Sequence, residues 1–78
     1  MKITIDTTAK AAYVRLKEGS CHTTKEILPE VFVDFNAQKE MLGIELISPC
    51  TLTLRKVAQK LKLPILNKIK KPLHEICA

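Results

Sequence analysis

The first fifty residues alternate between apolar and polar side chains with a period of two, which is typical of strands with one buried face. Four segments show this pattern, at residues 3–5, 12–16, 31–35 and 42–46. The third segment could begin at Lys25 and bend at Pro29, because proline has no N–H to give to a central ladder. The pattern predicts an antiparallel β-meander of about four strands.

The third and fourth predicted strands also indicate their register. A turn centred on Gln38 and Lys39 pairs the large apolar residues across the two strands, as Phe35 with Leu42, Val33 with Ile44, and Val31 with Leu46. All three pairs then lie on one face of the sheet. Because a slip by one residue would turn every one of these side chains to the other face, we expect this register to be well specified.

The opposite face of the predicted sheet is less polar than a half-solvated sheet usually is. It carries four large apolar or aromatic residues, Tyr13, Phe32, Met41 and Ile47. We therefore expect this face to be covered, either by the C-terminal helix or by a second copy of the sheet. In the second case these four residues form the dimer face.

From residue 54 the apolar residues follow a helical spacing, at Leu54, Val57, Ala58 and Leu61. A threonine cap at Thr51 or Thr53 precedes this helix. Pro64 interrupts it and is well placed to begin another, which Pro72 ends. The tail therefore predicts one or two short C-terminal α-helices, and the fold class is α+β.

The length of 78 residues leaves room for one hydrophobic core, so the whole chain is predicted to be a single domain. In this interpretation residues 1–50 form the β-meander and residues 51–78 form a basic helical tail. A core of this size rarely supplies more than about 3–5 kcal/mol of stability. We therefore expect self-association into a homo-oligomer.

Charge is divided unevenly along the chain. Residues 1–50 carry six basic and seven acidic side chains, whereas residues 51–78 carry seven basic side chains and one acidic. The basic set in the tail consists of Arg55, Lys56, Lys60, Lys62, Lys68, Lys70 and Lys71. Such a surface suits an acidic protein partner or the phosphates of a nucleic acid.

Three more specific uses of the tail receive less support from its sequence. Residues 54–63 resemble the first helix of a helix-turn-helix. However, Lys62 stands where the turn usually has glycine, and Lys68 stands where an apolar anchor is expected. The three aromatic residues all lie in the sheet, which argues against base stacking by the tail and against a membrane anchor. We therefore expect no membrane partner.

Cysteine usage indicates a reducing compartment. The N-terminus lacks the apolar stretch of a signal peptide, and the three cysteines are an odd number without CxxC spacing, so we expect a cytoplasmic protein. Two cysteines and two histidines form a candidate zinc ligand set, Cys21, His22, His74 and Cys77. A loop pair and an unrelated chain end explain them better than a zinc site does, because adjacent Cys21 and His22 tend to point in opposite directions on an extended chain, so no metal or cofactor is predicted.

Several runs resemble the small bacterial proteins grouped as domain of unknown function 2283, over roughly residues 1–50. They are the run from Asp6 to Leu16 with Tyr13, then Thr24-Lys25-Glu26, Val33-Asp34-Phe35-Asn36, and Leu42-Gly43-Ile44-Glu45. Two positions depart from the pattern. Lys10 stands where an acid is usual, and Lys39 stands where the hairpin usually has glycine, so we expect a less regular turn there.

The resemblance implies a small meander, and some members resemble partners of small toxin-like proteins in gene pairs. A small sheet of this kind has little concave volume, so Asp34 and Glu45 are expected to be surface carboxylates, and no enzyme is predicted. Our leading hypothesis is a protein-interaction module, antitoxin-like in its most specific form. The alternative is nucleic-acid binding through the basic tail.

Overall fold

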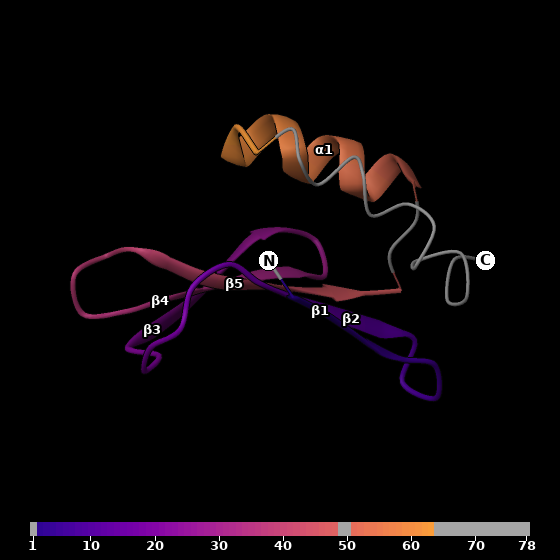
Figure 1. The fold of residues 1–78 in the computed structure, drawn as a ribbon. Helices are drawn as coiled ribbons and strands as arrows, with labels where there is room; N and C mark the ends of the chain where they lie inside the picture. Colours follow the sequence, from indigo (N-terminus) through magenta and orange to yellow (C-terminus); the bar gives the residue numbers. More distant parts are fainter. Residues whose placement is uncertain (1, 49–50, 64–78) are drawn as a thin grey trace.

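The alternating segments of the sequence form one antiparallel sheet of five strands, which is followed by a helix (Figure 1). The computed structural model describes residues 2–48 and 51–63. Its elements are β1 (Lys2–Asp6), β2 (Ala11–Arg15), β3 (Thr23–Leu28), β4 (Val31–Phe35), β5 (Met41–Ile47) and α1 (Thr51–Leu61). The α+β class is thereby confirmed, although the sheet dominates.

The prediction of about four strands was wrong by one, because β3 and β4 were predicted as a single bent strand. Leu28 is paired with Val31, so Pro29 and Glu30 form a two-residue turn that reverses the chain. Glu30 has a φ of 63°, and proline before a residue of positive φ is typical of a type II turn. Glutamate is an unusual residue for that position, and the turn therefore gave no clear signal in the sequence.

The strand order is β1-β2-β5-β4-β3, which is not a simple meander. Strands β1 and β2 are neighbours, and so are β3, β4 and β5 in turn, but β2 lies beside β5 instead of β3. The N–H groups of Leu16 and Lys17 both donate to the carbonyl of Leu42, at 2.8 and 3.1 Å, which ties the end of β2 to β5. The longest strand, β5, is thus the central one.

The core lies between the sheet and α1, on the face that the hydrophobic pattern predicted. Val14, Ile44 and Val33 form a row across β2, β5 and β4 and are fully buried. Val57 and Ala58 of α1 complete the cluster from above. Figure 1 shows α1 lying over this face of the sheet.

The predicted register of β4 and β5 is confirmed for two of its three pairs, Val33 with Ile44 and Val31 with Leu46. The third prediction was wrong, because a bulge after Asp34 places Phe35 opposite Met41. Both members of this pair then pack against the core cluster. A bulge shifts the alternation of faces by one residue.

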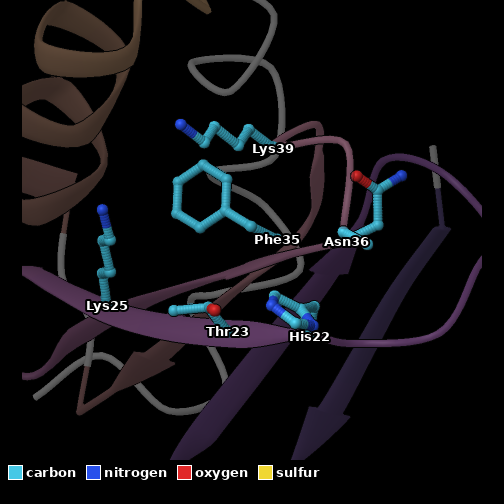
Figure 2. Close-up of a pocket in the computed structure, with 7 residues that line it drawn as sticks. His22, Thr23, Lys25, Phe35, Asn36 and Lys39 are labelled. Atoms are coloured by element: carbon cyan, nitrogen blue, oxygen red, sulfur yellow. The ribbon is translucent and has the colours of Figure 1, made fainter.

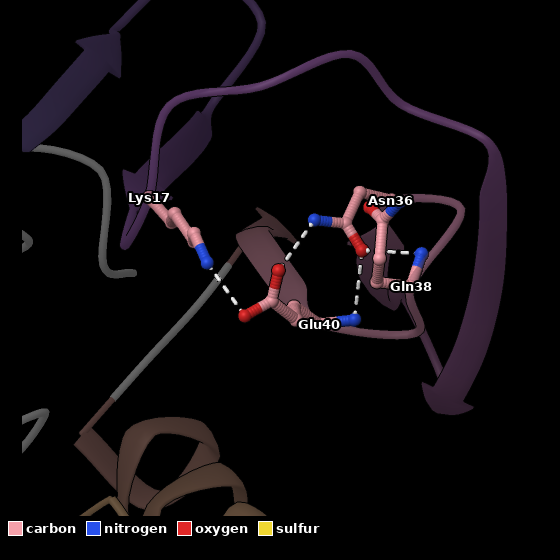
Figure 3. Close-up of polar contacts among 4 residues, drawn as sticks. All are labelled: Lys17, Asn36, Gln38 and Glu40. Carbon is pink, nitrogen blue, oxygen red and sulfur yellow. Dashed lines mark hydrogen bonds and ion pairs between the residues drawn. The ribbon is translucent and has the colours of Figure 1, made fainter.

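The turn between β4 and β5 is held by the side chain of Asn36 (Figure 3). Its Oδ1 accepts hydrogen bonds from the N–H groups of Gln38 and Glu40, both at 2.9 Å, and its amide donates to the Glu40 carboxylate at 2.9 Å. Lys17 pairs with the same carboxylate at 2.5 Å. Hydrogen bonds from Lys17 and then Asn36 lower the pKa of Glu40.

Helix α1 begins at Thr51, three residues before the first position of the apolar spacing, and ends in a Schellman motif. The N–H of Leu63 donates to the carbonyl of Ala58 at 2.9 Å, and that of Lys62 donates to Gln59 at 3.3 Å. Lys62 takes the left-handed φ of 56° that closes the motif. The second predicted helix lies outside the described residues.

Within the described part of the chain, no helix is long and apolar enough to cross a membrane.

The backbone conformation of Lys39 leads to a prediction about stability. Lys39 has a φ of 66°, a conformation that costs a residue with a Cβ about 1–2 kcal/mol but is free for glycine. Glycine also gives the unfolded chain more conformational entropy, which offsets part of this gain. Lys39→Gly should therefore raise the free energy of unfolding by about 0.5–1 kcal/mol in total. Urea denaturation measures this change.

Gln38→Gly is the matched control, since Gln38 occupies the same turn without a positive φ. It should lower the free energy of unfolding. Equal destabilisation by both substitutions would contradict the assigned turn geometry.

Candidate functional site

One face of the sheet is covered by α1, and among residues 2–48 and 51–63 no element covers the other face, which we call the open face (Figure 1). Its central row crosses all five strands, through Thr4, Tyr13, Glu45, Phe32 and Glu26. The adjacent row consists of Lys2, Arg15, Gly43, Asp34 and Thr24.

A hydrogen-bonded network fixes the middle of the open face. The Tyr13 hydroxyl donates to one oxygen of Asp34 at 2.9 Å, and the Thr24 hydroxyl donates to the other at 2.6 Å. The Tyr13 ring reaches Asp34 by lying across Gly43, where any added Cβ would collide with the ring. A glycine at this position is therefore a packing requirement of the tyrosine on the neighbouring strand.

The electrostatics of the network keep Tyr13 protonated. Partial burial first, and then the hydrogen bond and the negative charge of Asp34, raise its pKa from 10.0 to about 12. Arg15 lies 5.5 Å from the centre of the ring and opposes this shift. Tyr13 is thus a hydrogen-bond donor at neutral pH, and both oxygens of Asp34 are occupied.

Glu45 stands at the centre of the open face and is exposed. Shallow hollows lie on both sides of it, one of about 260 Å³ bordered by Phe32 and Asp34, and one of about 180 Å³ bordered by Tyr13 and Asp6. Within the described ranges, the Glu45 carboxylate has no hydrogen bond or ion pair with another side chain. It is therefore available to a ligand.

The residues predicted as a dimer face are separated by the structure. By register and alternation, Tyr13, Phe32 and Ile47 lie on the open face and are partly exposed. Met41 packs against the core cluster instead, because of the bulge after Asp34. The C-terminal helix was one of two predicted covers for this face, and α1 packs on the other side.

Four residues of the predicted basic set lie in the described part of the tail and are exposed there. We call them the basic helix surface, which consists of Arg55, Lys56, Lys60 and Lys62. Lys56 borders a hollow with Leu28 and Pro29, which places it over the β3–β4 turn. The other three predicted residues, Lys68, Lys70 and Lys71, lie outside the described residues.

A third feature, which the sequence did not indicate, is a hollow of about 300 Å³ around Phe35. Figure 2 shows the Phe35 ring between the side chains of Lys25 and Lys39, with His22 and Asn36 nearby. We call it the Phe35 hollow, and its lining residues are His22, Thr23, Lys25, Phe35, Asn36, Ala37 and Lys39. Its charged lining is entirely basic.

The candidate zinc ligands are only partly placed. Cys21 is exposed and lies 3.5 Å from the Thr24 hydroxyl, while His22 borders the Phe35 hollow. His74 and Cys77 lie outside the described residues. In the described ranges, no three residues of the types that bind metals gather in one place.

A family model described as Protein of unknown function (DUF2283) matches residues 2–48. This chain belongs to that family. The DUF2283 segment contains the entire sheet, the open face and the Phe35 hollow, whereas α1 lies beyond it. No curated protein and no protein of solved structure matches the chain.

The sequence runs that carry the resemblance to DUF2283 meet on the open face. Tyr13 from one motif lies across Gly43 from another and bonds Asp34 from a third. The sequence showed these residues as separate motifs and predicted Asp34 only as a surface carboxylate. Only the strand order, with β2 beside β5, brings Tyr13 to Gly43.

Tyrosine absorbance can test the network, because the chain contains one tyrosine and no tryptophan. The native titration midpoint should lie at about 12. Asp34→Asn should lower this pKa but leave it above 10.0, since burial, the larger cause, remains. Because the raised pKa belongs to the folded state, stability should fall as the pH rises from 10 towards 12.

A native titration at the ordinary tyrosine value, or one unchanged by Asp34→Asn, would contradict the network. Chemical denaturation at several pH values provides the independent check of the stability change.

Gly43→Ala should displace the Tyr13 ring, because the added methyl group would occupy its space. We expect a loss of about 1–3 kcal/mol in the free energy of unfolding, together with a lower Tyr13 pKa. In a Tyr13→Ala background the same substitution should cost much less, and denaturation of the four proteins measures this coupling. Additive losses would show that Tyr13 and Gly43 are not in contact.

Proposed function

We propose that this protein is a non-enzymatic interaction module that binds a basic polypeptide segment on its open face. The observation that carries the proposal is Glu45, an exposed carboxylate flanked by Tyr13 and Phe32 at the centre of an uncovered sheet. Aromatic rings beside a carboxylate suit the ammonium or guanidinium group of a partner residue.

The charge of the open face favours a basic partner. Its two central rows, with Asp6 at the end of β1, carry four acidic residues, Asp6, Glu26, Asp34 and Glu45. The basic residues of the same rows are Lys2 and Arg15. This face is acidic although the chain as a whole has a net charge of +5.

The same charges make a second copy of the open face a poor partner. A two-fold dimer centred on the middle row would bring the two Glu45 side chains together in a dry interface. Burying carboxylates without partners costs several kcal/mol per ion, roughly. We therefore assign this face to a different, basic protein. The antitoxin-like role toward a small partner that the family resemblance favours is one form of this function.

Nuclear magnetic resonance can test the proposal with defined probes. An arginine-rich peptide should shift the amide signals of Tyr13, Phe32 and Glu45 in the labelled full chain. A glutamate-rich peptide of the same length should leave these signals in place. Glu45→Lys should weaken binding of the arginine-rich peptide by about tenfold, as expected for losing one well-placed charge contact.

Glu30→Lys is the matched control, since it makes the same charge change at an exposed residue in the β3–β4 turn. It should leave most of the affinity. If Glu45→Lys and Glu30→Lys weaken peptide binding equally, the effect comes from net charge alone, and the proposal is overturned. Capture from host extract with the wild-type protein and with Glu45→Lys then identifies the natural partner.

A further inference from the structure

We propose that the Phe35 hollow is a binding site for a nucleotide unit, with the base against the Phe35 ring and the phosphate held by Lys25 and Lys39. The unit comes either from a free nucleotide or from a single-stranded nucleic acid, which share this chemistry. The site lies apart from the open face, and the inference is therefore independent of the protein-binding function proposed above.

The first argument is the character of the hollow. Its volume of about 300 Å³ lies at the lower end of the range for small-molecule sites. Two lysines and a histidine line it, together with Asn36, and its lining contains no acidic residue. The nearest acidic group of the turn, Glu40, is paired with Lys17 and Asn36. The hollow therefore favours an anion.

The second argument is the fixed position of the aromatic ring. Phe35 is partly exposed in the hollow and packs on its other side against the core cluster. Its carbonyl accepts a hydrogen bond from the His22 N–H at 2.7 Å, which joins the start of β3 to the end of β4. A base stacks favourably on such a ring whatever its identity, because every base has a π-face.

The third argument is the placement of the two lysines. The Lys25 ammonium lies 5.9 Å from the centre of the Phe35 ring. Lys39 extends alongside the ring (Figure 2), from a turn that is fixed by the three Asn36 hydrogen bonds. Because this turn is already ordered, a ligand that binds to Lys39 would restrict the backbone little further, and binding would lose little conformational entropy.

The tertiary structure here changes the expectation for nucleic-acid binding. The basic tail has no aromatic residue, and from the sequence alone this argued against base stacking. Phe35 and the basic residues are brought to one side of the sheet, since Phe35 and α1 pack against the same core cluster. The exposed basic residues of α1 therefore add positive charge on the same side of the sheet as the hollow, and positive charge favours binding of phosphates.

Titrations of the labelled full chain, followed by nuclear magnetic resonance, test the site with four probes. They are adenosine monophosphate, adenosine, inorganic phosphate and a short single-stranded oligodeoxyadenylate. Adenosine monophosphate or the oligonucleotide should shift the amide signals of His22, Phe35 and Lys39 saturably. Whichever of the two binds more tightly identifies the source of the nucleotide unit.

Two substitutions separate stacking from charge. Phe35→Leu keeps an apolar side chain against the core but removes the flat ring, and it should weaken binding by at least about fivefold. Lys39→Gln should weaken binding by about three- to tenfold, through the loss of a charge-assisted contact. Thermal unfolding of both variants confirms that the fold is retained.

Lys10→Gln is the matched control for Lys39→Gln. Both lysines are exposed in turns between strands, and their φ values are 53° and 66°. Equal losses from the two lysine substitutions would overturn the proposal. It would also be overturned if phosphate alone reproduces the shifts, if Phe35→Leu has no effect, or if no probe shifts these residues.

Discussion

The packing of α1 against one face of the sheet is the contact on which the rest of this structure depends. Val14, Ile44 and Val33 cross the three central strands as a row, and Val57 of α1 lies over them. Burial of such side chains contributes roughly 1.5–3 kcal/mol each, which is large beside the stability of a domain this small. The same contact leaves the opposite face of the sheet without a cover from any described element.

The helix that closes the core lies outside the segment that defines the family. Residues 2–48 belong to DUF2283 and form the complete sheet, but Val57 and Ala58 come from the chain beyond it. The family segment of this chain therefore exposes its apolar face unless something follows it. The open face, in contrast, is built entirely within the family segment, including the Tyr13–Asp34 hydrogen bond.

The two sides of the sheet differ in charge because of this arrangement. Acidic residues concentrate around Glu45 on the open face, while the exposed residues of α1 and the lysines of the Phe35 hollow make the other side basic. The separation lets one small domain present surfaces for partners of opposite charge. The proposed basic protein segment and the proposed nucleotide unit use different sides and need not compete.

The sequence by itself determined the core faces of β2 and β4, the register of Val33 with Ile44, and the helical character of residues 54–61, because these depend on local periodicity. It did not reveal the turn at Pro29 and Glu30, since glutamate carries no preference for the positive φ that it adopts there. Nor did it place β2 beside β5, because strand order is a matter of long-range pairing. Only that order brings Tyr13 over Gly43. The bulge that turns Met41 to the core side is likewise a property of the folded hairpin. The hollow that joins Phe35 to Lys25 and Lys39 also forms only in the folded sheet.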